Sequence, residues 1–223
     1  PIEEINKTVR NNRKVGLGIM GLAQLFVQLG ISYGSEESKE LTRQLMTNLN
    51  HKASDVTNQL AVERGSFGGW DESKYAEPAE YPEWFEKHTG EDPTEWEEGY
   101  PVRNHKKTTI APTGTTSMLA NTTGGCEPMY NVAYYKNVSP DVQGDEMLVE
   151  FDQYFLDVLE ENNIDIEEVK EEANELMSTN QFTGVRDLES VPEEIGELFI
   201  TTQELTPEQH AAVQCAAQEG VDS

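Results

Sequence analysis

Residues 112–117 bring together a proline, a glycine and four hydroxyl side chains, directly after a short apolar run. Backbone N–H groups at the start of a helix lack an intrahelical partner, and with nearby hydroxyls they can hold an anion such as phosphate. The loop has no lysine of the Walker type, which excludes that class of nucleoside triphosphatase site. From these residues alone, a phosphate cradle and an ordinary Ser- and Thr-rich helix cap are equal alternatives. The candidate ligands are Pro112, Thr113, Gly114, Thr115, Thr116 and Ser117.

Residues 16–21, GLGIMG, satisfy the G-x-G-x-x-G spacing of a dinucleotide-binding turn. Such a turn follows a hydrophobic β-strand, and an acidic residue ends the next strand about 20 positions later. Here the preceding residues are RNNRK, and the acids Glu36 and Glu37 stand at a predicted helix start. We therefore reject a nicotinamide site and expect the glycines to let a helix pack closely on its neighbours.

The two cysteines are candidates for thiol chemistry. Cys126 stands beside Glu127, but no histidine is clearly paired with it, and a small buried cysteine is the commoner case. Cys215 shares an apolar helix face with three alanines, so we expect a core residue. The chain has no CxxC motif and no Cys/His cluster, which excludes a disulfide scaffold and a zinc finger. We predict neither a metal site nor a catalytic residue in this chain.

Helical patterns dominate the first third of the chain. Apolar spacing predicts a helix over 15–30, ended by Gly30, and a long helix from Ser35 to about Arg64, closed by Gly65. The expected apolar stripe of the long helix comprises Leu41, Leu45, Leu49, Val56 and Leu60.

Strand patterns frame the candidate loop. Short strands are predicted at 108–111, which runs into the loop, at 129–138 and at 198–200. Acidic helices are predicted near 146–161 and 165–177, and a last helix begins at Thr206. Between Asp145 and Glu175 there are 13 acidic residues and one basic residue, which predicts a solvated face. Strands alternating with helices indicate an α/β fold.

Residues 66–105 have a different composition, with four Gly, four Pro and all three Trp. We expect an irregular acidic insertion over about 70–100, with one short helix near residues 83–88. The basic residues His105, Lys106 and Lys107 follow it, and we assign them no role because such residues often only flank a strand.

The charge of the chain restricts its partners and its surroundings. Its 42 acidic and 16 basic side chains give a net charge of -26. A large nucleic-acid-binding surface is excluded, because phosphate backbones require clustered Lys and Arg. Aromatic residues along the whole length favour a folded protein over a disordered one. An acidic surface repels itself in dilute buffer, so we expect a halophilic protein that needs salt to keep its structure.

No apolar stretch approaches 18 residues and no signal peptide opens the chain, so we expect a soluble, cytoplasmic protein without membrane contact. The chain has no initiator Met, begins at Pro1 and stops at Ser223 without a natural tail. We expect it to be a fragment of a longer polypeptide.

Four segments taken together resemble the large, catalytic chain of ribonucleotide reductase. They are RNNRKVGLGIMGLA at 10–23, LGISYGSEE at 29–37, RN at 103–104 before TIAPTGTTS at 109–117, and GCEP at 125–128. Their order and spacing match over most of the 223 residues. The amino-acid sequence of the loop most resembles the adenosylcobalamin-dependent class II type, and the acidic composition is typical of a haloarchaeal member.

The resemblance implies that residues 1–223 are a partial catalytic barrel domain, the second half of a ten-stranded α/β barrel. It implies that Pro112–Ser117 bind the substrate's phosphates. In the family a cysteine thiyl radical removes the ribose 3′ hydrogen, and a cysteine pair reduces the 2′ carbon. The reactive cysteine stands in an Asn-x-Cys-x-Glu setting that is missing here, so the fragment lacks it and is not expected to be active alone.

The resemblance also implies cofactors and partners. They are adenosylcobalamin with its cobalt, a ribonucleoside di- or triphosphate substrate, a thioredoxin-like reductant and a homodimeric full-length protein that supplies deoxyribonucleotides for DNA replication. Two alternatives remain open. One is a class I-type large subunit that needs a radical-generating partner, and the other is a non-catalytic fragment that keeps only the fold.

Overall fold

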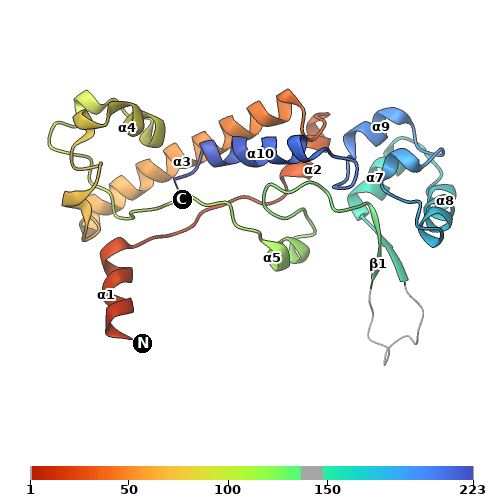
Figure 1. Ribbon diagram of the computed structural model, residues 1–223, viewed down its shortest axis with the longest axis horizontal. Coiled ribbons are helices and arrows are strands. Elements are labelled where there is room, and N and C mark those ends of the chain that lie inside the picture. The colour runs from red at the N-terminus through yellow and green to blue at the C-terminus, as the bar shows by residue number, and fades with distance from the viewer. Residues whose placement is uncertain (1, 137–147, 223) are drawn as a thin grey trace. The chain divides into compact units, whose positions relative to one another are not determined.

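The computed structural model describes residues 2–136 and 148–222, and these form two compact units. The first unit comprises Pro1–Met20, Lys39–Thr115 and Gln214–Ser223, and the second comprises Gly21–Ser38 and Thr116–Val213. Helices predominate in both, as the ribbon in Figure 1 shows. Within the described ranges, no helix combines the length and the apolar character that crossing a membrane requires.

The first unit is built on the long helix α3, Glu36–Arg64 (Figure 1). Its bounds agree with the prediction, and Gly65 ends it at φ +78° with its N–H bonded to Ala61 O. The predicted stripe was wrong, because Val56 is 54% exposed and the four leucines are only half-buried. The buried face of α3 within this unit consists of Thr42, Met46, Asn50, Ser54, Thr57 and Ala61.

A polar face can be buried here because its side chains bond to the segments that cover it. Ser54 Oγ donates to His88 O at 2.9 Å, and Thr57 Oγ1 donates to Asn104 Oδ1 at 3.0 Å. Asn50 Nδ2 also donates to His88 O, at 3.2 Å. Hydrophobic periodicity does not detect such a face, because each buried polar atom is satisfied by a partner distant in sequence.

Residues 66–102 form a small aromatic core instead of an open excursion. Helix α4, Pro82–Thr89, confirms the predicted short helix, and three 3₁₀ turns surround it: η1 Trp70–Glu72, η2 Pro78–Glu80 and η3 Pro93–Glu95. The buried members of this core are Phe67, Tyr75, Phe85, Tyr100 and Val102, with Trp70, Trp84 and Trp96 packed against them. Whether these residues are an insertion stays a prediction.

The glycine-rich segment 14–20 is extended. Helix α1, Glu3–Asn12, precedes it and ends at Arg13, whose φ is +50°. A parallel bridge joins Leu17 to Thr108, and Leu17 N–H donates to Lys107 O at 2.8 Å. The predicted helix over 15–30 therefore begins later, as α2, Leu22–Leu29, and ends at Gly30 as expected. Helical apolar spacing begins only at Leu22. Before it, Val15, Leu17 and Ile19 alternate with glycines, a pattern that suits an extended segment lying close to another backbone.

The second unit contains the only described sheet, in which β1, Ala133–Lys136, pairs antiparallel with β2, Leu148–Phe151. The predicted strand at 129–138 is confirmed for 133–136, and residues 137 and 138 lie outside the described ranges. The predicted helix near 146–161 was wrong at its start: α7 spans Gln153–Glu161, and its N-cap Asp152 accepts from Phe155 N–H. Of the residues before it, 146 and 147 lie outside the described ranges, and 148–151, LVEF, form β2.

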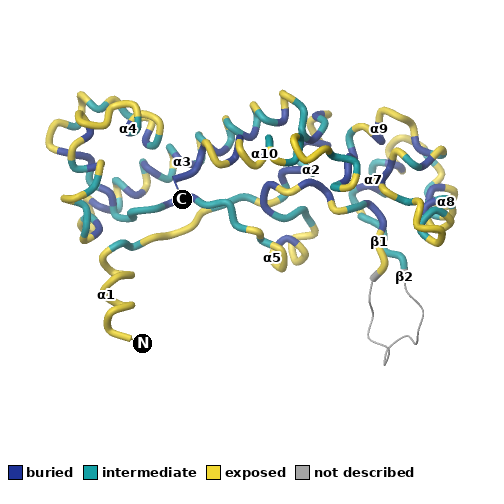
Figure 2. The backbone as a smooth tube through the Cα atoms, in the orientation of Figure 1, coloured by how far each residue is buried: buried dark blue, intermediate teal, exposed yellow. Residues whose placement is uncertain are grey.

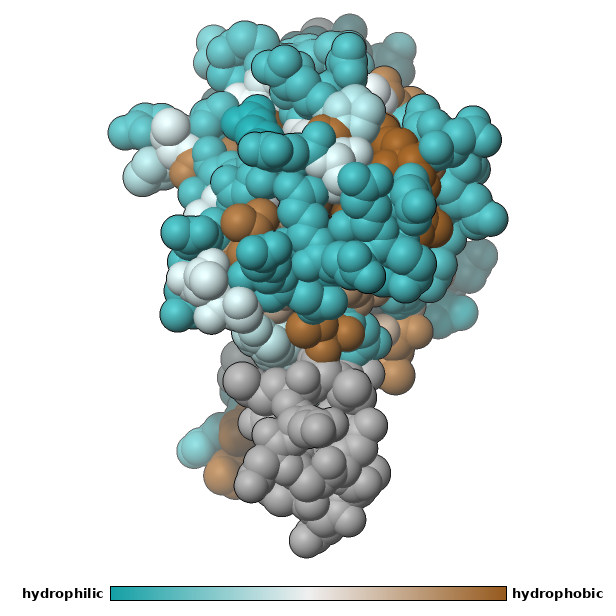
Figure 3. Space-filling model, turned by 90° about the vertical axis from the view of Figure 1, so that its right-hand side faces the viewer, coloured by the Kyte–Doolittle hydropathy of each residue, from teal (hydrophilic) through white to brown (hydrophobic). Residues whose placement is uncertain are grey.

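Further helices of the second unit follow α7 along the chain. Helix α8, Ile166–Ser178, follows its predicted cap Asp165, and η4, Val185–Asp187, follows it. Helix α9, Glu193–Leu198, takes up Leu198, so the predicted strand at 198–200 was wrong. Phe199 and Ile200 are buried without pairing as a strand, because a short apolar run does not distinguish a strand from a buried turn. Figure 3 views this end of the molecule, where the surface is mainly hydrophilic with separate apolar patches.

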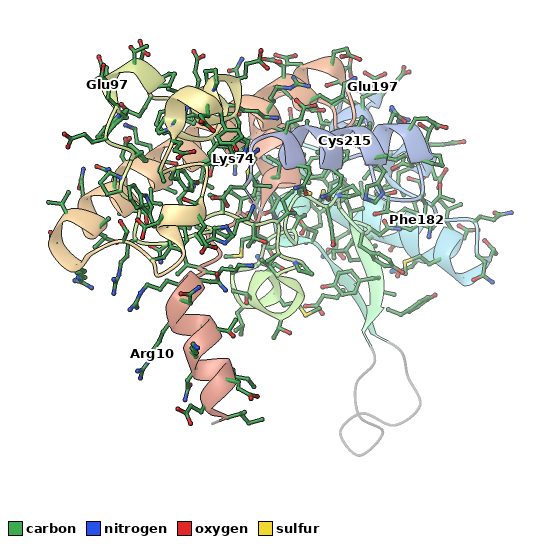
Figure 4. The ribbon with its side chains drawn as sticks, turned by 60° about the vertical axis from the view of Figure 1, so that its left-hand side comes forward. Arg10, Lys74, Glu97, Phe182, Glu197 and Cys215 are labelled. Atoms are coloured by element: carbon green, nitrogen blue, oxygen red, sulfur yellow. The ribbon has the colours of Figure 1, made fainter. Side chains whose placement is uncertain are left out.

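Helix α10, Pro207–Glu219, has the predicted start: Gln209 N–H donates to Thr206 Oγ1 at 3.2 Å, and Thr206 N–H donates to Gln209 Oε1 at 3.0 Å. Cys215 was predicted to be a core residue, and this was wrong because its side chain is exposed (Figure 4). The helix buries Val213, Ala216 and Ala217, so Cys215 lies on the opposite side.

Candidate functional site

The loop at 112–117 leads into α5, Gly114–Leu119, and most of it lies on the surface (Figure 2). Pro112, Gly114, Thr115 and Thr116 are exposed, whereas Ser117 is 4% exposed. Met118 and Leu119 on the same helix are 80% and 87% exposed, so the loop is bordered by two large apolar side chains facing outward. The helix has six residues, so its dipole is short and contributes little to holding an anion.

Thr113 has an unusual backbone. Its φ is +52°, in the left-handed region that β-branched residues rarely adopt. Such a conformation costs on the order of 1–3 kcal/mol and is concentrated at active sites and ligand clamps. The ring of Pro112, the residue before Thr113, fixes its own φ at about −65°. The backbone is therefore restricted at both residues that lead into α5.

Gly114 has space around it that its own fold does not use. Apart from its chain neighbours and the backbone of its own helix, no described atom lies within 4 Å of a Cβ built at this position, and its φ is not in the left-handed region. The protein's own backbone therefore does not require glycine here. Open space beside a backbone is what the close approach of an anion requires.

The segment before the loop is fixed from one side by Asp222. The carboxylate of Asp222 accepts from Lys107 N–H at 3.1 Å and from Thr108 N–H at 3.0 Å, both through Oδ1. Lys107 Nζ lies 2.6 Å from Asp222 Oδ2, with side-chain exposures of 2% and 3%. Burial opposes ionisation of Asp222, but the Lys107 ammonium and the amide hydrogen bonds outweigh it and hold the pKa of that carboxyl below its usual value.

Gly16 and Gly18 fix the same segment from the other side. A Cβ on Gly18 would lie 2.7 Å from Thr109 O, and one on Gly16 would lie 2.8 Å from Thr109 Cγ2. These glycines do allow close packing, but the segment that contains them is extended, so the helix expected there was wrong. The rejection of a dinucleotide-binding turn agrees with this placement. Helix α1 and an extended linker precede the glycines, where such a turn would follow a β-strand.

Cys126 lies in the second unit and is 3% exposed. Burial and the nearby Glu127 carboxylate raise the pKa of its thiol, and Tyr33 Oη donates to the carbonyl of Cys126 at 2.6 Å. A buried thiol with a raised pKa is a poor nucleophile. Among the residues that the structure describes, no three His, Cys, Asp or Glu side chains come together as a metal site.

Asp222 and Lys107 were not identified from the sequence. Lys107 was given no role. Asp222 is one of 42 acidic residues and is the penultimate residue of the sequence. Their pairing joins positions 115 residues apart, and no local pattern in the sequence indicates it.

The whole chain, residues 1–223, matches the family model of the ribonucleotide reductase barrel domain. This chain belongs to the ribonucleotide reductase barrel family. The resemblance inferred from the four sequence segments is thereby confirmed.

Curated relatives in this family include two vitamin B12-dependent ribonucleoside-diphosphate reductases. The one from Thermoplasma acidophilum is 33% identical over 100% of this chain and 25% of its own length. The one from Mycobacterium tuberculosis is 31% identical over 100% of this chain and 28% of its own length. The chain thus spans about a quarter of the length of these relatives.

A solved structure has a similar fold. The class Id ribonucleotide reductase alpha subunit of Actinobacillus ureae superposes with a TM-score of 0.67 over 97% of this chain and 33% of that one, at 19% sequence identity. At this identity the likeness establishes the fold. The prediction of a reductase barrel fold is confirmed, and the assignment to the second half of ten strands stays a prediction.

Proposed function

We propose that this chain is the part of a ribonucleotide reductase that holds the phosphates of a ribonucleoside di- or triphosphate, through Pro112, Thr113, Gly114, Thr115, Thr116 and Ser117. The observation that carries the proposal is the exposed, strained turn at Thr113 beside the open space at Gly114. Membership of the reductase family and the hydroxyl-rich composition of the loop support it. Backbone amides and hydroxyls would donate to the phosphate oxygens.

Phosphate binding far from the reacting carbon would help the reaction by positioning the substrate. Binding energy from a remote group can fix the ribose in the orientation that hydrogen abstraction needs. The radical cysteine and the reducing cysteine pair belong, on this proposal, to other parts of the enzyme. Cys126 is given no part in the radical chemistry, because its thiol is buried and its pKa is raised.

The proposed cofactor is adenosylcobalamin, which two relatives carry in their names as vitamin B12. The group would supply the initiating radical. We assign no residue of this chain to a contact with the cobalamin. A thioredoxin-like protein would return electrons to the enzyme, which we expect to be cytoplasmic and, at full length, a homodimer.

The test is ribonucleotide reduction by the full-length protein that contains this sequence. We expect 2′-deoxyribonucleotide only when adenosylcobalamin and a dithiol are both present, and a steep rise in KM with an unchanged fold for Gly114→Val. A valine fits sterically at this surface position but fills the space that the phosphate would occupy. Wild-type KM in Gly114→Val would remove the phosphate assignment, and activity that depends on a partner protein instead of the cofactor would favour the class I-type alternative.

A further inference from the structure

The buried carboxylate of Asp222 lies against the backbone that leads into the proposed phosphate loop. Two successive amide groups, Lys107 N–H and Thr108 N–H, donate to it at 3.1 and 3.0 Å. The Lys107 ammonium closes the arrangement at 2.6 Å, and Tyr75 Oη accepts a further hydrogen bond from that ammonium at 2.9 Å. One carboxylate thus holds two consecutive residues by their main chain.

Hydrogen bonds in the opposite direction complete the contact. Asp222 N–H donates to Thr108 Oγ1 at 3.1 Å, and that hydroxyl lies 2.9 Å from Asn50 Oδ1. Lys106 Nζ donates to the carbonyl oxygen of Asp222. The Lys107 ammonium and the Thr108 hydroxyl, together with the two main-chain amides, match residues 107 and 108 to Asp222 in the observed register.

The restraint continues from Thr108 to the edge of the loop. Thr109 N–H donates to Leu17 O at 2.9 Å. A Cβ on Gly18 would lie 2.7 Å from Thr109 O and 3.8 Å from Ala111 N, so the two backbones are in contact up to the residue before Pro112. A displacement at 107–108 would be transmitted along a short, extended and closely packed segment to the first residue of the loop.

We infer that Asp222 is a positioning residue for the phosphate loop, acting through the register of residues 106–111. The inference rests on the proposed function of that loop. A buried ion pair is weak evidence for stability, because the loss of hydration offsets the attraction, and its better-attested use is to select one arrangement over its neighbours. Displacements of about 1 Å in a group that orients a substrate can reduce rates a hundredfold.

The test measures cytidine 5′-diphosphate binding to the 223-residue chain by titration calorimetry, together with amide hydrogen exchange over residues 106–117. In Asp222→Asn we expect binding at least ten-fold weaker and faster exchange in that segment. Asn keeps the size of Asp222 but turns an amide donor toward the Lys107 ammonium. The matched control is Phe85→Leu, a fully buried site in the aromatic core, which we expect to lower the thermal midpoint without changing the affinity.

The outcomes separate the inference from the proposed function. If the wild-type chain does not bind the nucleotide, the proposed function of the loop in this chain fails, and hydrogen exchange alone decides the positioning role. If wild type binds and Asp222→Asn binds equally well, or if Phe85→Leu weakens binding as much, the inference is overturned. Should Asp222→Asn not fold, Lys107→Met/Asp222→Leu removes both charges together, and the same weakening is expected from it.

Discussion

Two consecutive stretches of the chain are held in opposite ways. Residues 106–111 lie between Asp222 on one side and the glycines at 16 and 18 on the other, and Lys107 and Thr108 are almost completely buried. The next six residues comprise the strained Thr113 and the start of α5, with Pro112, Gly114, Thr115 and Thr116 exposed. On our proposal, the buried segment supplies the position and the exposed residues of the loop supply groups for a ligand.

The largest expected effect is that of salt concentration on the folded structure. It tests whether residues 106–111 stay protected when the rest of the chain loses structure. With a net charge of -26, the chain repels itself once the screening length grows from about 3 Å in molar salt to more than 10 Å below 0.1 M. We expect helical circular dichroism to fall between 3 M and 0.05 M KCl, and the amides of 107 and 108 to be among the last to exchange. An unchanged far-UV spectrum would argue against the salt requirement.

Removing one partner of the buried ion pair should act next most strongly. Asp222→Ala leaves the Lys107 ammonium buried without its counter-ion, and we expect it to lower the free energy of unfolding by about 3–5 kcal/mol. Arg43→Ala, which breaks an exposed pair with Glu219, should lower that free energy far less, because solvent screens an exposed ion pair. Denaturant unfolding of both variants measures the difference, and equal losses would contradict the special status of the buried pair.

Glycine substitutions compare the two stretches directly. Gly18→Ala places a methyl group 2.7 Å from a backbone oxygen, and we expect a loss of about 1–3 kcal/mol from the forced shift. Gly114→Ala meets open space, and its effect on stability should stay within about 0.5 kcal/mol. Thermal unfolding of the pair provides the measurement. A larger loss at Gly114 than at Gly18 would reverse the proposed roles.

The pH dependence of stability gives the smallest effect. The pKa of Asp222 is held below its ordinary value by Lys107 and the amide groups, despite the opposing effect of burial. Its contribution is therefore fully present above the unfolded pKa of about 3.9 and is lost as pH falls through the lower folded pKa. We expect the stability difference between wild type and Asp222→Asn to shrink below about pH 4. A difference that is constant from pH 7 to pH 3 would contradict this coupling.

Much of the helical structure could be predicted because local signals determine it. The cap at Ser35, the glycine at 65 and the reciprocal cap at Thr206 and Gln209 each depend on residues a few positions apart. The predicted strand at 108–111 was correct only as an extended segment. It pairs through a single bridge to Leu17, a partner more than 90 residues away.

The buried face of α3 and the role of Glu172 could not be predicted for the same physical reason. Thr57 and Asn50 are buried because distant groups satisfy them. Glu172 was included in a solvated acidic face, yet its carboxylate accepts from Glu189 N–H at 2.6 Å and Ser190 N–H at 3.0 Å. A residue type at helical spacing does not reveal a partner from another segment.

The candidate site was predicted only in part. The loop was identified from its own residues and from the resemblance to the reductase family, since glycine and hydroxyl residues form a contiguous pattern. The strained φ of Thr113 and the open space at Gly114 required coordinates. Asp222 required them too, because its contact with residues 106–108 is made by main-chain groups that every residue possesses.

The most direct test of the central claim is an amide NMR titration of the 223-residue chain with cytidine 5′-diphosphate. We predict saturable shifts concentrated at the amides of 113–117, and their loss in Gly114→Val, whose remaining spectrum should match that of wild type. Shifts confined to other parts of the chain, or identical shifts in Gly114→Val, would contradict the assignment of residues 112–117 as the phosphate site.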